Sequence, residues 1–189
     1  MDLIIIAISA SLINNVVMSQ FLGICPFLGV SKKTGPALGM GAAVTFVMVM
    51  SSFVCFIIYA FILKPFDLEY LYIIAFILVV ASLVQLCEIF IKRFSPTLYS
   101  ALGVYLPLMV TNCAIVGVSI INMQSSYSFT ASIVNAVFSG VGFTLAIVIF
   151  AGLREQIEHC DIPACFRGAP ISLIAAGLMS IAFMGFAGI

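Results

Sequence analysis

A glycine- and proline-marked stretch interrupts the first apolar run of the chain, and it reads Phe21-Leu22-Gly23-Ile24-Cys25-Pro26-Phe27-Leu28-Gly29-Val30. A shorter segment with a similar sequence lies far downstream, Asn112-Cys113-Ala114-Ile115-Val116-Gly117-Val118. Both segments contain the pattern Cys-x-x-x-Gly-Val, and their cysteines, at positions 25 and 113, are 88 residues apart. A break that carries a cysteine and occurs twice in so apolar a chain is the first place to look for chemistry.

The composition indicates an integral membrane protein. Of the 189 residues, 64% are hydrophobic and only 7% are charged, and the mean hydropathy is +1.32. A soluble domain carries about 25% charged residues, so this chain cannot cover a water-facing surface. The formal net charge is zero and there is no basic patch, which argues against a nucleic-acid partner. The apolar run begins at Leu3 without a basic region or a cleavage site, so we expect the first segment to remain as a span.

Six apolar segments are each long enough to cross a membrane, which takes about 20 mostly apolar residues. The first is interrupted at Asn14-Asn15, and the fourth contains Pro107 and the second cysteine motif. The expected fold is therefore an all-α polytopic membrane protein of six transmembrane helices, with interrupted first and fourth spans. The segments are Leu3–Leu22, Ala37–Leu63, Leu71–Ile91, Leu98–Ile121, Ala131–Leu153 and Pro170–Ile189.

The basic residues predict the orientation. Six of the seven follow the first, third and fifth spans, and only Lys64 lies on the opposite side. Because basic loops stay in the cytoplasm, both termini are predicted to lie outside it. We expect Arg154-Glu155, at the end of the fifth span, to form a helix-end ion pair at the membrane interface. The six basic residues are Lys32, Lys33, Lys92, Arg93, Arg154 and Arg167.

The repeated motif suggests an inverted repeat. A period of 88 residues holds three spans, and because three is odd the second half would lie upside down relative to the first. We predict one membrane domain, residues 1–189, built as a 3+3 inverted-topology repeat of residues 1–94 and 95–189, an arrangement found in many transporters. Irregular backbone is tolerated in a membrane only where protein or a cavity surrounds it. The two breaks are expected to face each other, with Cys25 and Cys113 near mid-membrane.

Two cysteines in an interior site suit a soft metal or an iron–sulfur cluster. An ordinary [2Fe–2S] cluster needs four cysteine ligands, so a related partner chain would supply two more. We expect Pro26 to hold the chain after Cys25 away from helix, and the glycines at 23, 29 and 117 to let backbone approach a cluster. Two alternatives stay open: both cysteines pack as small hydrophobes, which is common for free cysteine, or they form a Cys25–Cys113 disulfide.

Polar groups near the breaks are the other candidates for a site. Asn14, Asn15, Thr111 and Asn112 either satisfy backbone groups freed by the breaks or line a path for a small cation. Glu88 is the only acid well inside an apolar run, and it is either a functional intramembrane acid or the partner of Lys92 in a helix-end ion pair. Cys55 and Cys87 are expected to serve packing only. The segment from His159 to Cys165 resembles a metal clip, but its spacing favours a solvated loop.

Several motifs along the whole chain form a characteristic set. They are Asn14-Asn15, Phe21–Lys33, Ser95-Pro96-Thr97-Leu98-Tyr99, Leu106-Pro107-Leu108, Thr111–Ala114, Asp161-Ile162-Pro163, Phe166-Arg167-Gly168 and Ala176–Phe186. In these motifs the chain resembles the A-subunit family of the Rnf ion-translocating oxidoreductases. The E-subunit family of the sodium-translocating NADH:quinone oxidoreductases is similar, but Cys25-Pro26-Phe27 and the double asparagine favour the Rnf family.

The resemblance implies a homologous partner of opposite topology, the Rnf E subunit. It implies that the two proteins hold a [2Fe–2S] cluster in the membrane with two cysteines from each, here Cys25 and Cys113. The cluster would relay electrons between cytoplasmic redox subunits and outer flavin-bearing subunits, while the complex couples ferredoxin and NAD⁺ chemistry to Na⁺ or H⁺ movement across the inner membrane of a prokaryote. Further partners would be the Rnf B, C, D and G subunits and membrane lipid, and the chain would not be catalytic alone.

Two rival functions belong to other classes. A secondary transporter would bind a small substrate at the broken helices, and Cys25→Ser would leave its function mostly intact. A purely structural subunit would tolerate replacement of both cysteines together. The absence of a glycine-rich phosphate loop after a strand argues against direct binding of NADH.

Overall fold

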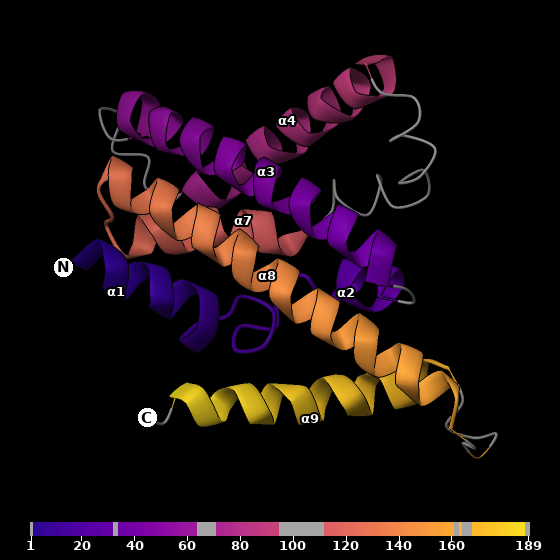
Figure 1. Ribbon diagram of the computed structural model, residues 1–189. Coiled ribbons are helices and arrows are strands. Elements are labelled where there is room, and N and C mark those ends of the chain that lie inside the picture. Colours follow the sequence, from indigo (N-terminus) through magenta and orange to yellow (C-terminus); the bar gives the residue numbers. More distant parts are fainter. Residues whose placement is uncertain are drawn as a thin grey trace.

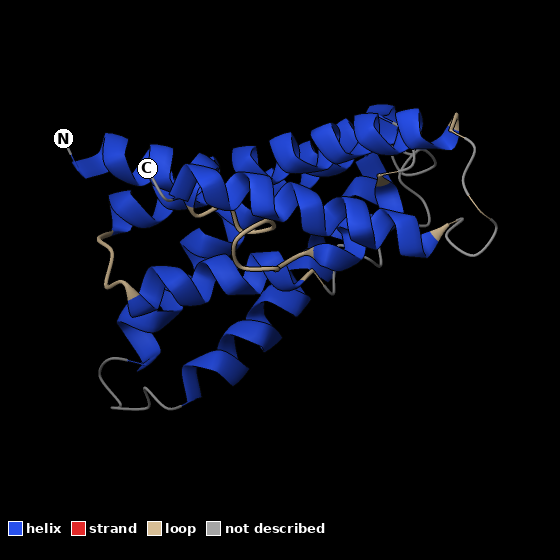
Figure 2. Cartoon of the chain, turned by 90° about the horizontal axis from the view of Figure 1, so that it is seen from below, coloured by secondary structure: helices blue, strands red, loops and turns tan. Residues whose placement is uncertain are grey.

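The computed structural model describes residues 2–31, 34–63, 71–94, 112–160, 163 and 168–187, and every regular element in these ranges is helical (Figures 1 and 2). The first half contains α1 (Asp2–Ile8), the π-helical turn η1 (Ser9–Ile13), α2 (Ile24–Val30), α3 (Thr34–Ile58), the π-helical turn η2 (Tyr59–Leu63) and α4 (Tyr72–Phe94). The second half contains α7 (Cys113–Gln124), α8 (Phe129–Glu158) and α9 (Ala169–Ala187).

Four of the six predicted spans are helices that end within a few residues of the expected positions. They correspond to α3 with η2, α4, α8 and α9, and α8 continues beyond Leu153 to Glu158. The first span differs, because its helix ends at Ile13 rather than at Leu22. The Asn14-Asn15 pair starts a non-helical segment that runs to Gly23. Of the fourth span, residues 98–111, which include Thr111, lie outside the described part.

Helices α3 and α8 lie side by side and form the centre of the bundle (Figure 1). Each has a glycine that receives a threonine of the other: a Cβ on Gly41 would be 2.6 Å from Cγ2 of Thr144, and a Cβ on Gly140 would be 2.6 Å from Cγ2 of Thr45. The two threonine Oγ1 atoms are 3.4 Å apart. Helix α1 with η1 packs against α8, and α7 packs against α3, while α9 contacts η1 and α8 and α4 contacts α3 and α7 but diverges from α3 (Figure 1).

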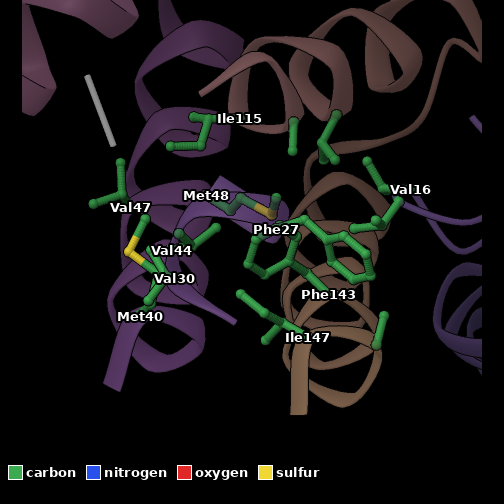
Figure 3. Packing of buried hydrophobic residues seen from close by; sticks show 14 of the residues in the cluster. Val16, Phe27, Val30, Met40, Val44, Val47, Met48, Ile115, Phe143 and Ile147 are labelled. Carbon is green, nitrogen blue, oxygen red and sulfur yellow. The ribbon is translucent and has the colours of Figure 1, made fainter. Parts of the chain in front are cut away.

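The core fills the space between α2, α3, α7 and α8 (Figure 3). Phe27 of α2 stacks on Phe150 of α8 with ring centroids 4.3 Å apart, and Phe143 and Met48 are fully buried beside them. The outward faces carry large aliphatic and aromatic side chains, such as Phe61, which is 78% exposed. Because a soluble monomer rarely exposes apolar surface so widely, these faces suit contact with lipid or with other membrane subunits.

By length and composition, two helices of the described part could cross a membrane, Thr34–Phe61 and Phe129–Glu158. The 30 residues of α8 span about 45 Å, more than the roughly 30 Å hydrocarbon core of a bilayer. The polar last turns of α8 therefore extend past the hydrocarbon or the helix tilts. The start of α1 and the end of α9 lie at the same end of the bundle, opposite the end of α8 (Figure 1).

Candidate functional site: two helix breaks that meet

The first break is anchored to α8 by Asn15. This side chain is fully buried, and its Nδ2 donates to the carbonyl oxygen of Gly142 at 2.9 Å, while its Oδ1 accepts from the Val17 N–H at 3.1 Å. Asn15 therefore provides hydrogen bonds to a segment that has left the helix, where unpaired backbone groups are costly in a membrane. The contact needs a glycine on α8, because a Cβ at position 142 would lie 2.8 Å from the Ser11 carbonyl oxygen.

The break ends at Gly23, which is the N-cap of α2. Its φ of +81° lies in the left-handed region that favours glycine. Cys25 and Pro26 follow in the first turn of α2. The expectation that Pro26 keeps the chain out of a helix is wrong, because the first turn has no intrahelical acceptor for its N–H groups and proline fits there without loss.

The second break places Asn112 at the N-cap of α7 and Cys113 at its first residue. The Asn112 Oδ1 accepts from the Ala114 N–H at 3.0 Å. The Nδ2 of the same amide is buried and has no hydrogen-bond partner within the described residues. A buried amide N–H without an acceptor is uncommon and is available to a group that the chain alone does not provide.

The two breaks meet directly. The Gly23 N–H donates to the Cys113 Sγ at 2.9 Å, and a Cβ on Gly117 would overlap Cδ1 of Leu22. Gly23 and Gly117 thus permit close contact between the two segments. This arrangement brings residues separated by 90 positions into one site in the middle of the chain's fold.

The cysteines fall into two groups. Cys25 and Cys113, in the first turns of the two short helices, are exposed free thiols. Cys55 is a fully buried free thiol in the core, which confirms that it serves packing. Cys160 is an exposed free thiol beyond the end of α8, and the side chains of Cys87 and Cys165 lie outside the described part. In the described residues, no three His, Cys, Asp or Glu side chains come together as a metal site.

The structure does not bring the remaining predicted residues that it describes, Asn14 and Glu88, together with the cysteines. Asn14 is exposed and its Nδ2 donates to the Ser9 Oγ at 3.0 Å, one turn earlier. Glu88 is half-buried on α4, and the predicted partner Lys92 has a side chain outside the described part. Thr111 precedes the described start of the second break.

Arg154 connects α8 to the first half of the chain, a role that the sequence did not reveal. Its Nη1 donates to the carbonyl oxygen of Leu28 at 2.7 Å and to the Ser31 Oγ at 3.0 Å, and its guanidinium lies 5.9 Å from the centroid of the Phe150 ring. Leu28 is in the last turn of α2, where carbonyl groups lack helical partners and a cation is favourable. Arg154 therefore fixes the end of the helix whose first turn carries Cys25, rather than forming the expected pair with Glu155.

We expect Arg154→Met to destabilise the protein by about 1.5–3 kcal/mol, the range for hydrogen bonds to a charged donor. Methionine keeps much of the apolar stem but leaves the Leu28 carbonyl and the buried Ser31 hydroxyl without this donor. The measurement is the thermal transition of the purified complex, with Arg93→Met, at an exposed position on α4, as the control. Equal transitions for the two variants would contradict the role given to Arg154.

Long apolar helices, an apolar outer surface and two helix breaks that contact each other define the class as an integral membrane protein with broken helices. The sequence matches the family model described as "Rnf-Nqr subunit, membrane protein" over residues 3–189, and the chain belongs to this family.

Curated relatives match the whole chain. It is 57% identical over 188 residues to the A subunit of the "Na(+)-translocating ferredoxin:NAD(+) oxidoreductase complex" of Acetobacterium woodii, covering 100% of this chain and 98% of the relative. It is 55% identical over 188 residues to the A subunit of the "Ion-translocating oxidoreductase complex" of Syntrophotalea carbinolica, covering 100% and 97%. A relative of the same description in Vibrio vulnificus is 48% identical over 188 residues, covering 100% and 98%.

Proposed function

We propose that this chain is the A subunit of a Rnf-type ion-translocating oxidoreductase and carries electrons through the membrane while the complex moves a cation. The full-length similarity to subunits described in these terms supports the assignment. The chain acts as part of a redox-driven translocase, in the cell membrane of a prokaryote, and is not catalytic alone.

Within that function, the chain provides half of an intramembrane [2Fe–2S] site. The observation that carries this proposal is the contact between the breaks, where the Gly23 N–H meets the Cys113 Sγ at 2.9 Å while both Cys25 and Cys113 keep exposed thiols. Apolar bundles bury free cysteines, as this one buries Cys55. Two exposed thiols at one internal junction are instead suited to ligands that a second protein completes.

The residues present fit such a cluster as one half of its ligand set. Cys25 and Cys113 supply two of the four thiolates that a [2Fe–2S] cluster needs, and the homologous partner, the Rnf E subunit, supplies two. Cys113 lies at the N-terminus of the 12-residue helix α7, where free N–H groups favour negative charge. The Gly23 N–H donates to the Cys113 sulfur, and such donors tune the potential of a cluster. When bound, the cluster supplies one-electron transfer.

The architecture proposed for this function is the 3+3 inverted repeat. Support comes from the reciprocal contact in which Thr144 fills the space over Gly41 and Thr45 fills the space over Gly140. Such an exchange of equivalent contacts is what a two-fold relation between α3 and α8 produces. The basic residues favour an orientation in which the Arg154 end of α8 faces the cytoplasm and the termini lie outside. The Rnf B, C, D and G subunits are the proposed further partners.

The test is iron content and low-temperature EPR of the purified complex from wild type, Cys25→Ser and Cys113→Ser. Each variant is expected to lose about two iron atoms per complex and one [2Fe–2S] signal, because serine is a poor ligand for this cluster. Electron transfer through the membrane is expected to fall by more than about tenfold, since the relay site is lost.

Cys160→Ser is the matched control, because Cys160 is also an exposed free thiol but lies beyond the end of α8. It is expected to keep the iron, the signal and the rate of the wild type. Full iron content and full electron transfer in both Cys25→Ser and Cys113→Ser would reject the cluster and favour a transporter or a purely structural role.

A further inference from the structure

A cavity with a partly polar lining lies beside the first break. Its volume is about 390 Å³, which is room for several water molecules. The walls come from α1 and η1, the first break, the second half of α7, the turn after α7 and the first half of α8. The polar side chains among its lining residues are Ser9, Asn14, Gln20, Ser125, Tyr127, Asn135 and Ser139, and none of the lining residues carries a charge.

Two oxygen-bearing side chains on α8 line this cavity. Asn135 and Ser139 are only 7% and 2% exposed, lie one helical turn apart and line the cavity. Within the part of the chain that the structure describes, the Ser139 Oγ makes no hydrogen bond, and the Asn135 Oδ1 makes none either. Oxygen atoms that line a cavity and have no partner in the protein are available to water or to a ligand in that cavity.

A chain of hydrogen bonds determines which side-chain atom of Asn135 has no partner in the described part of the protein. The Ser132 carbonyl oxygen can only accept, and it accepts a hydrogen bond from the Nδ2 of Asn122 at 3.3 Å. Asn122 must then present its Oδ1 to Asn135, whose Nδ2 donates to it at 2.7 Å. The amide nitrogen of Asn135 is therefore occupied and its carbonyl oxygen Oδ1 remains for the cavity.

We propose that this cavity binds a monovalent hard cation, such as Na⁺, that keeps part of its water shell. Hydroxyl and amide carbonyl oxygens are the ligands that hard cations prefer, and a divalent ion would normally require carboxylates, which the lining lacks. A relay of protons would need titratable groups, and Tyr127 is the only one among the lining residues. The proposal rests on the proposed function, because it assigns a place to the cation that the complex moves.

The position of the cavity suits coupling to the cysteine site. Ser139 is followed on α8 by Gly142, which accepts from Asn15, and by Phe143, whose ring lies 3.1 Å from the Cβ position of Gly23. Four residues of helix separate Ser139 from Phe143, which is about 6 Å along the axis. We therefore expect a cation in the cavity and a charge at the cysteines to interact, because the dielectric constant inside a membrane protein is low.

The test compares Ser139→Ala with Ser132→Ala in the purified complex. Both serines lie on α8, both are at most 2% exposed, and the Ser132 Oγ also lacks a hydrogen bond in the described part of the chain, but only Ser139 lines the cavity. The probes are equilibrium binding of ²²Na⁺ and the Na⁺ concentration for half-maximal electron transfer, at constant ionic strength with choline chloride. Ser139→Ala is expected to weaken Na⁺ binding about three- to tenfold, the range for loss of one buried polar partner.

Asn135→Leu is a second variant and is expected to weaken Na⁺ binding at least as much, because it removes the Oδ1 ligand. Ser132→Ala is expected to bind Na⁺ as the wild type does. Unchanged ²²Na⁺ binding in both cavity variants, or an equal loss in Ser132→Ala, would overturn the proposal. Iron content and EPR of the same preparations separate the two proposals. If the cavity proposal is wrong, Na⁺ binding is unchanged in the cavity variants and the cluster signal can still be present. If the cluster proposal is wrong, the cysteine variants keep their iron and their signal.

Discussion

Gly142→Val is expected to remove most of the folded protein from the membrane. A Cβ at this position would lie 2.8 Å from the carbonyl oxygen and 3.1 Å from the Cα of Ser11, and these backbone atoms cannot rotate away. It would also lie 3.2 Å from the Nδ2 of Asn15, whose hydrogen bond to the Gly142 carbonyl anchors the first break.

The two effects are separate in origin. Overpacking costs about 1–3 kcal/mol, and loss of partners for the buried amide of Asn15 costs about 1–3 kcal/mol more. Together they approach the lower end of the total stability of a folded domain, about 5 kcal/mol. The measurement is the amount of this protein in isolated membranes and in the purified complex.

Gly152→Val provides the matched control on the same helix. Gly152 is exposed, and a Cβ there would meet nothing within 4 Å. The control is expected to assemble normally, since both variants put the same β-branched residue into α8. Equal assembly of the two variants would show that η1 and α8 do not pack as described.

Gly23→Val is expected to leave an assembled protein that loses its iron. A valine at φ +81° costs at least about 1–2 kcal/mol of backbone strain. Its Cβ would also lie 3.1 Å from both the Ala114 Cβ and the Phe143 ring, so the start of α2 must move away from α7. That movement separates the Gly23 N–H from the Cys113 Sγ and changes the position of Cys25.

Gly168→Val is the control that separates the effect of backbone strain from the effect of the steric contacts at Gly23. Gly168 has a φ of +102°, in the same left-handed region, but a Cβ there would meet nothing within 4 Å. Iron content and the [2Fe–2S] EPR signal are expected to fall in Gly23→Val to the level of Cys113→Ser and to stay normal in Gly168→Val. A normal signal in Gly23→Val would contradict the placement of the cluster site at the junction of the breaks.

The sequence predicted the elements that depend on local composition. Apolar length predicted the helices, and Asn14-Asn15 predicted the interruption of the first span, because adjacent amides compete with the helix for backbone hydrogen bonds. The prediction failed at Pro26, since the break lies before Cys25 and proline is accommodated in the first turn that follows. The inference that the two breaks meet came from the repeated cysteine motif, and the structure places Gly23 on Cys113.

Contacts between distant segments were not predictable from local pattern. Gly142 occurs in an apolar helix that contains other glycines, and only the approach of Ser11 distinguishes it from Gly152. Arg154 counted as one more basic residue at a helix end until its hydrogen bond to Leu28 was located. Asn135 and Ser139 are polar residues within a predicted span, and the cavity that they line depends on the packing of α1, η1, the first break, α7, the turn after it and α8.

The hydrogen bonds of the first break have a consequence for biosynthesis. The hydrogen bond of the Asn15 side chain to Gly142 requires a residue that is synthesised 127 positions later. The hydrogen bond of the Leu28 carbonyl with Arg154 requires one that is synthesised 126 positions later. At about 5–20 residues per second, translation takes on the order of 10 seconds to supply these partners. During this time the nascent first half would hold the Asn15 amide and the Leu28 carbonyl without these partners in or near the bilayer, so its integration is expected to depend on insertion machinery that shields the segment until α8 emerges.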